Sequence, residues 1–200
     1  MQDGYTDVPS GKIATIVTFL EMSERPDWID NADMRGLHFA AQTTPDLDWY
    51  RDFFRQIGAN WLWVSRLLMT DSELHKTLNE PNKKLFTVQL DGEDIGISEL
   101  SHNPKGDVEL SFFGIIGKHT GAGFGRAIMA QTLQKAWRDN PQKVHLQTCT
   151  LDHPAAIKFY QKCGFVPVKQ VIQVLDDPRL TGLLPEEMAP HVPLIKPNNS

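Results

Sequence analysis

The chain has 200 residues, of which 40% are hydrophobic and 22% are charged, and its formal net charge is −5. This composition excludes a disordered chain, and the acidic balance argues against nucleic-acid binding, which needs a basic face. Its apolar runs are far shorter than the roughly 20 residues of a membrane span, and the N-terminus lacks a signal-peptide pattern. We therefore expect a cytoplasmic protein with no membrane or nucleic-acid partner, in which Cys149 and Cys163 are free thiols.

Strand and helix patterns alternate in the first part of the chain. Lys12–Leu20 is rich in β-branched residues and predicts a strand, whereas residues 21–44 are expected to be irregular. Apolar residues at helical spacing predict a helix over 45–57. A second helix is expected to begin with Asp71 as its cap and to end near residue 80.

The middle of the chain changes to a β pattern. Leu85–Leu90 and Ile95–Leu100 predict two strands joined by an Asp-Gly hairpin turn, and Val108–Ile116 predicts a third. Together they indicate an antiparallel meander. A glycine-rich stretch, 117–125, then leads into a long helix expected over about 122–138.

The remainder returns to alternating elements. A strand is predicted over 143–150, followed by a helix over about 153–163 with Asp152 as N-cap and Gly164 as C-cap. Phe165–Val174 predicts the last strand, and the prolines that follow predict an extended tail on the surface.

This order of elements predicts the α/β (α+β) class with one mixed, mostly antiparallel sheet flanked by helices. We expect a single domain over 1–200, with its core at about 12–173 and a proline-rich extension over 174–200.

The glycine loop between a predicted strand and a predicted helix suits an anion. Glycines let backbone N–H groups approach a phosphate closely, and a helix N-terminus adds partial positive charge. A Walker loop is excluded because Gly125 is followed by Arg126 and Ala127 instead of Lys-Ser/Thr. A dinucleotide fingerprint is excluded because its third glycine would fall at Arg126.

This loop resembles the coenzyme A loop of the GNAT (general N-acetyltransferase) superfamily, Arg/Gln-x-x-Gly-x-Gly/Ala. Gly123 and Gly125 occupy the two small positions and Thr120 the Arg/Gln position. A second segment, Ala156–Phe165, resembles the family's Asn-x-x-Ala-x-x-x-Tyr-x-x-x-Gly-Phe motif, with His153 at the Asn position. The two motifs occur in the family's order, separated by a predicted helix and strand.

The resemblance implies a GNAT fold whose strands splay at the coenzyme A site. It implies an N-acetyltransferase that moves an acetyl group from acetyl-CoA to an amine of a small molecule or peptide, by direct attack in a ternary complex. A non-catalytic acyl-CoA-binding regulatory domain is the alternative. Many members are homodimers, which leaves a homodimer open here. Cofactor contacts are implied at Ile115, Ile116, Thr120, Gly121, Ala122, Gly123, Phe124, Gly125, Arg126, His153 and Ala156.

Two catalytic residues are also implied. Tyr160 would protonate the leaving thiolate, although a core tyrosine is the alternative. Glu109 aligns with the general base of the histone-acetylating branch, whereas a surface ion pair is its structural alternative. Glu99 or a water molecule could serve as the base instead.

The strand that carries Glu109 is also relevant to how the oxyanion formed during acetyl transfer would be stabilised. Period-two alternation predicts two faces, one with Glu109, Ser111 and Phe113 and the other with Leu110, Phe112 and Gly114. The resemblance implies a backbone N–H near Ile115 as oxyanion donor, with Gly114 and Gly117 consistent with a bulge there.

A metal site is not expected. His145, Cys149 and His153 are spaced by four, but on a strand such residues lie about 13 Å apart, too far to share one ion.

Overall fold

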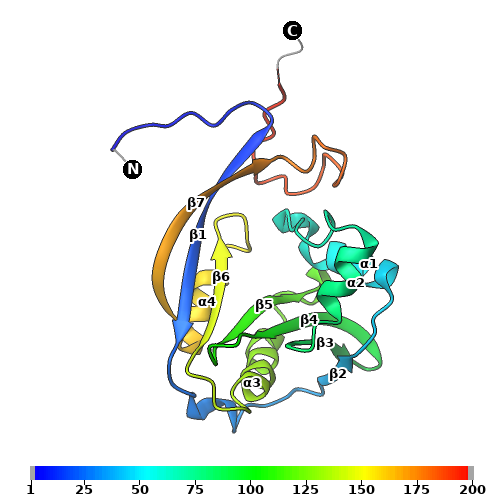
Figure 1. The fold of residues 1–200 in the computed structure, drawn as a ribbon, viewed down its shortest axis with the longest axis vertical. Coiled ribbons are helices and arrows are strands. Elements are labelled where there is room, and N and C mark those ends of the chain that lie inside the picture. Colours follow the sequence, from blue (N-terminus) through cyan, green and yellow to red (C-terminus); the bar gives the residue numbers. More distant parts are fainter. Residues whose placement is uncertain (1–2, 198–200) are drawn as a thin grey trace.

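A mixed sheet of seven strands organises the chain, in the order β2-β3-β4-β5-β6-β1-β7 (Figure 1). The computed structural model describes residues 3–197. The strands are β1 (Lys12–Met22), β2 (His38–Gln42), β3 (Lys83–Leu90), β4 (Glu93–His102), β5 (Val108–Ile115), β6 (Val144–Cys149) and β7 (Val166–Asp176). Neighbouring strands are antiparallel except β5 and β6, which are parallel. The predicted single mixed, mostly antiparallel sheet is confirmed.

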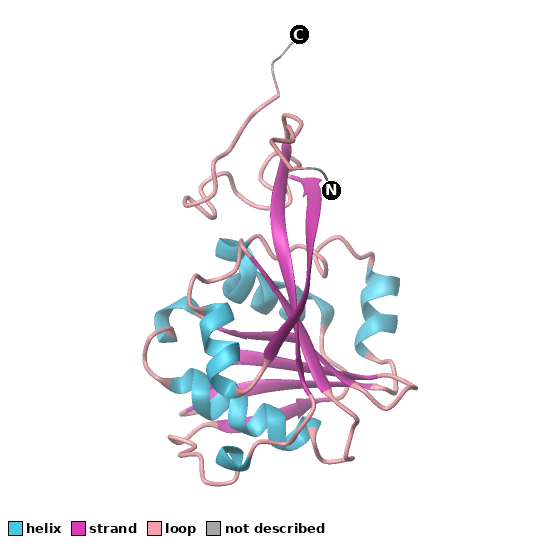
Figure 2. Cartoon of the chain, turned by 90° about the vertical axis from the view of Figure 1, so that its left-hand side faces the viewer, coloured by secondary structure: helices cyan, strands magenta, loops and turns pink. Residues whose placement is uncertain are grey.

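Helices cover both faces of this sheet (Figure 2). They are α1 (Leu47–Gly58), α2 (Asp71–Leu78), α3 (Phe124–Ala136) and α4 (Ala156–Cys163), with short 3-10 turns η1 (Asp27–Ile29), η2 (Ala59–Trp61) and η3 (Gly117–His119). Successive side chains of a strand point to opposite faces. Accordingly Leu85 of β3 packs in the apolar cluster of α1 and α2, and its neighbour Phe86 packs in the cluster of α3 and α4. Within residues 3–197, every helix is too short or too polar to cross a bilayer.

Helix α1 follows directly from its sequence pattern. Tyr50, Phe54 and Ile57 recur at helical spacing, and all three are buried against the sheet. The carboxylate of Asp46 accepts the N–H of Trp49 and so caps the first turn. The predicted helix is confirmed.

Two predictions for the first half are wrong. Helix α2 is capped by Thr70 and not by Asp71, because the Thr70 hydroxyl accepts the N–H of Glu73 while the Glu73 carboxylate accepts the N–H of Thr70. Residues 21–44 are not wholly irregular, because β2 lies within them and pairs with β3. This short strand lacks β-branched residues, and pairing with the edge of β3, more than local propensity, makes it a strand.

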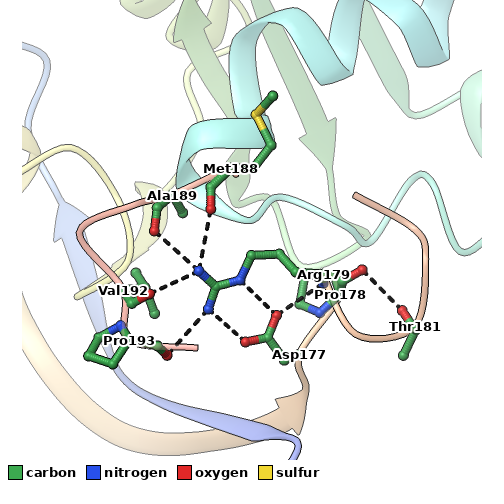
Figure 3. A network of polar contacts seen from close by, with 8 residues as sticks. All are labelled: Asp177, Pro178, Arg179, Thr181, Met188, Ala189, Val192 and Pro193. Atoms are coloured by element: carbon green, nitrogen blue, oxygen red, sulfur yellow. Dashed lines mark hydrogen bonds and ion pairs between the residues drawn. The ribbon is translucent and has the colours of Figure 1, made fainter. Parts of the chain in front are cut away.

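The C-terminal segment is not the extended tail that its prolines predict. Strand β7 continues to Asp176, and the chain then turns back so that Leu184 and Ala189 are buried in the cluster of α1. A buried arginine holds this turn (Figure 3). The guanidinium of Arg179 pairs with Asp177 and donates to four backbone carbonyls, those of Met188, Ala189, Val192 and Pro193.

Charge is balanced inside this turn. Burial by itself raises the pKa of Asp177, but the hydrogen bonds from Arg179 outweigh it, so the pKa of Asp177 lies below its ordinary value. Asp177 and Arg179 are 1% and 4% exposed, so either partner left alone would be a buried, unpaired charge.

We predict that Arg179→Met lowers the free energy of unfolding by about 3–5 kcal/mol, because it leaves Asp177 and four carbonyls without a donor. Urea denaturation followed by circular dichroism measures the loss. Lys196→Met, which removes an exposed ion pair with Glu186 in the same segment, is the matched control and should change stability by less than about 1 kcal/mol. Equal losses in the two variants would contradict the assigned role of Arg179.

Candidate active site

The candidate site opens where β5 leaves β6. Two residue pairs, Val108 with Val144 and Glu109 with His145, join these parallel strands. From Leu110 on, β5 keeps β4 as its neighbour, while its other edge has no strand partner in the described part of the chain. A cavity of about 550 Å³ occupies the opening, lined by β5, β6, the start of α3, α4 and the segment after α1. Backbone groups along this open edge are therefore available to a ligand.

Ser111 forms a bulge in β5. The register between β4 and β5 shifts between Glu99 and Leu100, which leaves Ser111 without an opposite residue. The extra residue changes which side chains share a face. Phe112 contacts the aromatic rings beside α1, whereas Phe113 stacks on the side of α4.

The faces predicted for β5 are therefore wrong beyond the bulge. Leu110 packs in the cluster of α3 and α4, but Phe112, which the alternation places beside it, packs with α1. Phe113 lies on the same side as Leu110 instead of opposite to it. The bulge also lies at Ser111 and not at Gly114 or Gly117, so it displaces the whole end of the strand.

Ile115 presents a free donor to the opening. The N–H of Ile116 donates to the carbonyl of Ile95 in β4. Consecutive residues of a strand point their N–H groups to opposite edges, so the N–H of Ile115 points away from β4, toward the cavity that Ile115 lines. Of the two isoleucines implied at the cofactor, only Ile115 has its donor on that side.

The glycine loop leads from β5 into α3. Gly121 and Gly123 both have φ of +84°, a left-handed conformation that favours glycine. Gly123 is the N-cap residue of α3, so the helix begins at Phe124, later than predicted, and no side chain caps this end. The first N–H groups of α3 therefore lack an intrahelical partner and, with the partial positive charge of the helix, suit a phosphate.

Six of the seven residues implied at this loop line one of two cavities, whereas Ala122 lines neither. Those that line the main cavity are Thr120, Gly121, Phe124 and Gly125. Gly123 and Arg126 line a second cavity of about 410 Å³, together with Trp28 and Arg35. The guanidinium of Arg126 lies over the ring of Trp28, 4.0 Å from its centroid.

Arg35 is a residue at this loop that the sequence analysis missed. Its Nη1 donates to the carbonyl of Ala122 at 2.9 Å, and its guanidinium lies over the ring of Phe124, 5.1 Å from the centroid. Thr120 brings no cation to the loop, whereas Arg35 brings one from the segment before β2. The motif could not reveal it, because Arg35 lies 87 positions from Ala122 in the sequence.

Tyr160 lies in the wall of the main cavity. Its ring packs edge-on against Phe113, Phe159 and Phe165. Burial, and after it the charge of Asp152, raises the pKa of Tyr160 above its ordinary value. The hydroxyl is therefore held in its protonated form, as a proton donor needs to be.

Asp152 is not the N-cap of α4, as the sequence predicts. Helix α4 begins later, at Ala156, after Ala155 as its cap. The carboxylate of Asp152 turns back instead and accepts the hydroxyl and N–H of β6 and the indole N–H of the segment after α1. Its donors are Thr148 Oγ1 at 2.7 Å, the Cys149 N–H at 2.9 Å and Trp63 Nε1 at 2.9 Å.

The two glutamates considered as bases lie elsewhere. Glu109 is half-buried at the root of the splay and is not among the described residues that line either cavity. Glu99 is 1% exposed, forms an ion pair with Arg66 and accepts the hydroxyl of Tyr50. Glu99 therefore neutralises a buried arginine.

His153 and Ala156, from the second motif, both line the main cavity. The Nδ1 of His153 accepts the N–H of Ala155, and its ring meets Trp61 edge-on at 5.1 Å. Because Nδ1 accepts this bond, the ring hydrogen is on Nε2, which faces away from the bond and can donate. His145, Cys149 and His153 do not gather, and no group of three or more His, Cys, Asp or Glu within residues 3–197 has the geometry to hold a metal ion.

The comparison with known families agrees with this geometry. The model of the acetyltransferase (GNAT) family matches residues 47–165, which is more than half of the chain. The chain belongs to the GNAT family. The splay between β5 and β6 lies within the matched region of this GNAT domain. No curated protein matches the chain.

Solved structures share the GNAT fold at low sequence identity. A conserved protein of unknown function from Staphylococcus epidermidis superposes with a TM-score of 0.58 at 15% identity, over 84% of this chain and 63% of the other, so this chain spans less than two thirds of that protein. An aminoglycoside acetyltransferase from an uncultured soil metagenomic sample gives 0.55 at 18%, over 70% and 94%. The spermidine/spermine N-acetyltransferase of Vibrio cholerae gives 0.53 at 20%, also over 70% and 94%.

We predict that Gly123→Ala lowers the free energy of unfolding by about 1–2 kcal/mol, because it forces an L side chain into a left-handed conformation. Its new Cβ would also clash with the Nη1 of Arg35. Urea denaturation measures the loss, and adding Arg35→Ala should relieve part of it. Gly117→Ala is the control, since a Cβ there meets open space. A loss for Gly117→Ala as large as for Gly123→Ala would contradict this account of the loop.

Proposed function

We propose that the chain is a cytoplasmic N-acetyltransferase that transfers the acetyl group of acetyl-CoA to an amine of a small molecule or peptide, by direct attack in a ternary complex. The observation that carries this proposal is the cavity between β5 and β6, which has free N–H groups of α3 at one end and Tyr160 in its wall. Residues 1–200 act as one domain in this proposal, because Leu184 and Ala189 of the C-terminal segment are buried with α1.

The donor binds along the open edge of β5. The N–H groups at Gly121–Arg126 take the diphosphate of coenzyme A, and Arg35 adds a positive charge beside them. The pantetheine arm then lies in the splay, where backbone groups of β5 and the Nε2 of His153 are its polar partners. Ala156, at the first turn of α4, leaves room for the arm.

The transfer needs three events at the far end of the arm. The amine nitrogen forms a bond to the thioester carbon, and the carbonyl oxygen becomes an oxyanion that accepts the N–H of Ile115. The carbon–sulfur bond then breaks, and the hydroxyl of Tyr160 gives its proton to the sulfur. The amine nitrogen releases a proton. Glu109, the base implied by the resemblance, does not line the cavity, so in this proposal it acts through an intervening water.

Tyr160→Phe tests the acid. We expect kcat for thiol release from acetyl-CoA to fall by about 10²-fold, because general acid catalysis contributes at least that much, while the Kd for coenzyme A stays unchanged. A thiol reagent measures the product with a panel of amines, and calorimetry measures binding. Tyr5→Phe is the matched control, since Tyr5 is fully exposed and lies in the N-terminal segment before β1. Full turnover by Tyr160→Phe would remove the acid from the mechanism.

The same assay separates the two functions that the sequence left open. Thiol release that depends on an added amine supports the transferase. Tight binding of coenzyme A with no turnover on any amine of the panel would instead favour a regulatory acyl-CoA-binding domain.

Arg35→Gln tests the cation at the loop. We expect the KM for acetyl-CoA to rise by about tenfold, and the rise to shrink at high salt, because a charge near the diphosphate is lost. The kcat with a saturating amine should stay within about twofold. Arg25→Gln is the control, since Arg25 pairs with Asp30 in the same segment without reaching the loop. A KM equal in both variants would show that Arg35 does not meet the donor.

A further inference from the structure

The charged residues that line the main cavity are of one sign. Among the described residues that line it, Asp152 is the one carboxylate, and neither lysine nor arginine contributes to the lining. Two aromatic rings of the lining lie on this side. Trp63 donates to Asp152, and Trp61 meets the ring of the next residue, His153. A carboxylate flanked by aromatic rings is a combination that favours a cation.

Asp152 is held in place by three hydrogen bonds. The donors are the Thr148 hydroxyl, the Cys149 N–H and the Trp63 indole N–H. Thr148 and Cys149 bond to one carboxylate oxygen, Oδ2, whereas Oδ1 receives the indole N–H alone and keeps a second acceptor position. This half-buried carboxylate is therefore fixed in position, with one acceptor site open to a cationic partner.

The position of Asp152 places that charge near the reaction. Its negative charge is one cause, after burial, of the raised pKa of Tyr160, so the two groups lie within electrostatic range of each other. It also lies on the side of the cavity formed by Trp63, which belongs to the segment between α1 and α2 and not to the glycine loop. Glu99 already neutralises Arg66, and Glu109 lies outside the lining, so neither competes for this role.

We propose that Asp152 binds the ammonium group of the acceptor through Oδ1 before that nitrogen gives up one proton, through water to Glu109, and attacks the thioester. Trp61 and Trp63 lie against the apolar part of the acceptor, so that the enzyme selects cationic aliphatic amines. This inference rests on the proposed acetyltransferase function and names its substrate class. An acidic acceptor is disfavoured, because its carboxylate or phosphate would face Asp152 with no lysine or arginine of the lining to offset the repulsion. The net charge of −5 attracts the same class of substrate at longer range.

Asp152→Asn tests the proposal with spermidine, sisomicin and benzylamine as cationic probes and aniline as a probe that is neutral at assay pH. For cationic probes we expect the KM to rise by about tenfold or more, and the Kd of the same amine for the complex with coenzyme A to rise in parallel. The KM for acetyl-CoA and the response to aniline should stay within about twofold. Asp152→Glu, which keeps the charge, should recover part of the loss.

Trp63→Phe distinguishes a substrate-binding role of Asp152 from a structural role of its bond to Trp63. It removes the indole N–H that Asp152 accepts, but it keeps an aromatic ring at position 63 and the carboxylate of Asp152. If this contact were purely structural, Trp63→Phe would cause the same kinetic loss as Asp152→Asn. We expect instead a smaller rise in KM for the cationic amines. An unchanged KM for them in Asp152→Asn, an equal loss with aniline, or a wild-type protein that binds no cationic probe would overturn the inference.

The outcomes also distinguish this inference from the proposed function. Wild-type turnover with an amine, unaffected by Asp152→Asn, would leave the acetyltransferase intact and remove only the ammonium site. A wild-type protein that binds coenzyme A and releases no thiol with any amine would remove both.

Discussion

The parting of β5 from β6 is the constraint on which the rest of the molecule depends. A parallel pair that ends after two residues leaves one edge of β5 unpaired inside the protein, and unpaired backbone groups are costly unless water or a ligand satisfies them. Packing on both sides keeps the strands apart. Phe113 stacks on Phe159 of α4, and Phe112 meets Phe54 of α1 and Trp63 of the segment after it, so closing the gap would break both contacts.

The bulge at Ser111 is what directs Phe112 and Phe113 to these two sides of the sheet. Without it, strand alternation would direct Phe112 toward α3 and leave Phe113 facing α1. With it, one aromatic residue goes to each wall of the cavity. The same shift sets which backbone N–H groups near the end of β5 bond to β4, and hence leaves the N–H of Ile115 on the open side.

Local patterns predicted the elements of this fold well. The spacing of Tyr50 and Phe54, the Asp91-Gly92 turn and the two small positions at Gly123 and Gly125 each depend on neighbours in sequence, and each feature is found in the structure. Most failures have one cause, which is contact between distant segments. The cap of α2 is the exception, since Thr70 and Glu73 are close in sequence. Nothing near Ser111 marks a bulge that the register with β4 creates.

The same reason explains what was missed at the site. Asp152 has the sequence context of a helix cap, but its carboxylate accepts instead from Thr148 and Cys149 of β6 and from Trp63, which lies 89 positions away. Arg35 reaches Ala122 from the segment before β2. The fold of the C-terminal turn depends on Arg179, whose four carbonyl partners follow it by nine to fourteen positions without any regular pattern.

Charge is distributed in a way that suits two different ligands. Arg35 and Arg126 lie at the glycine loop, outside the main cavity, whereas Asp152 lies within it. An anionic donor and a cationic acceptor would thus each meet the opposite charge, and neither would have to pass the other's site. Trp61 extends this wall of the cavity outward, since its ring meets both His153, before α4, and His191 of the C-terminal segment. The turn held by Arg179 therefore also supports this wall, because the carbonyls that Arg179 binds at Ala189 and Val192 flank His191.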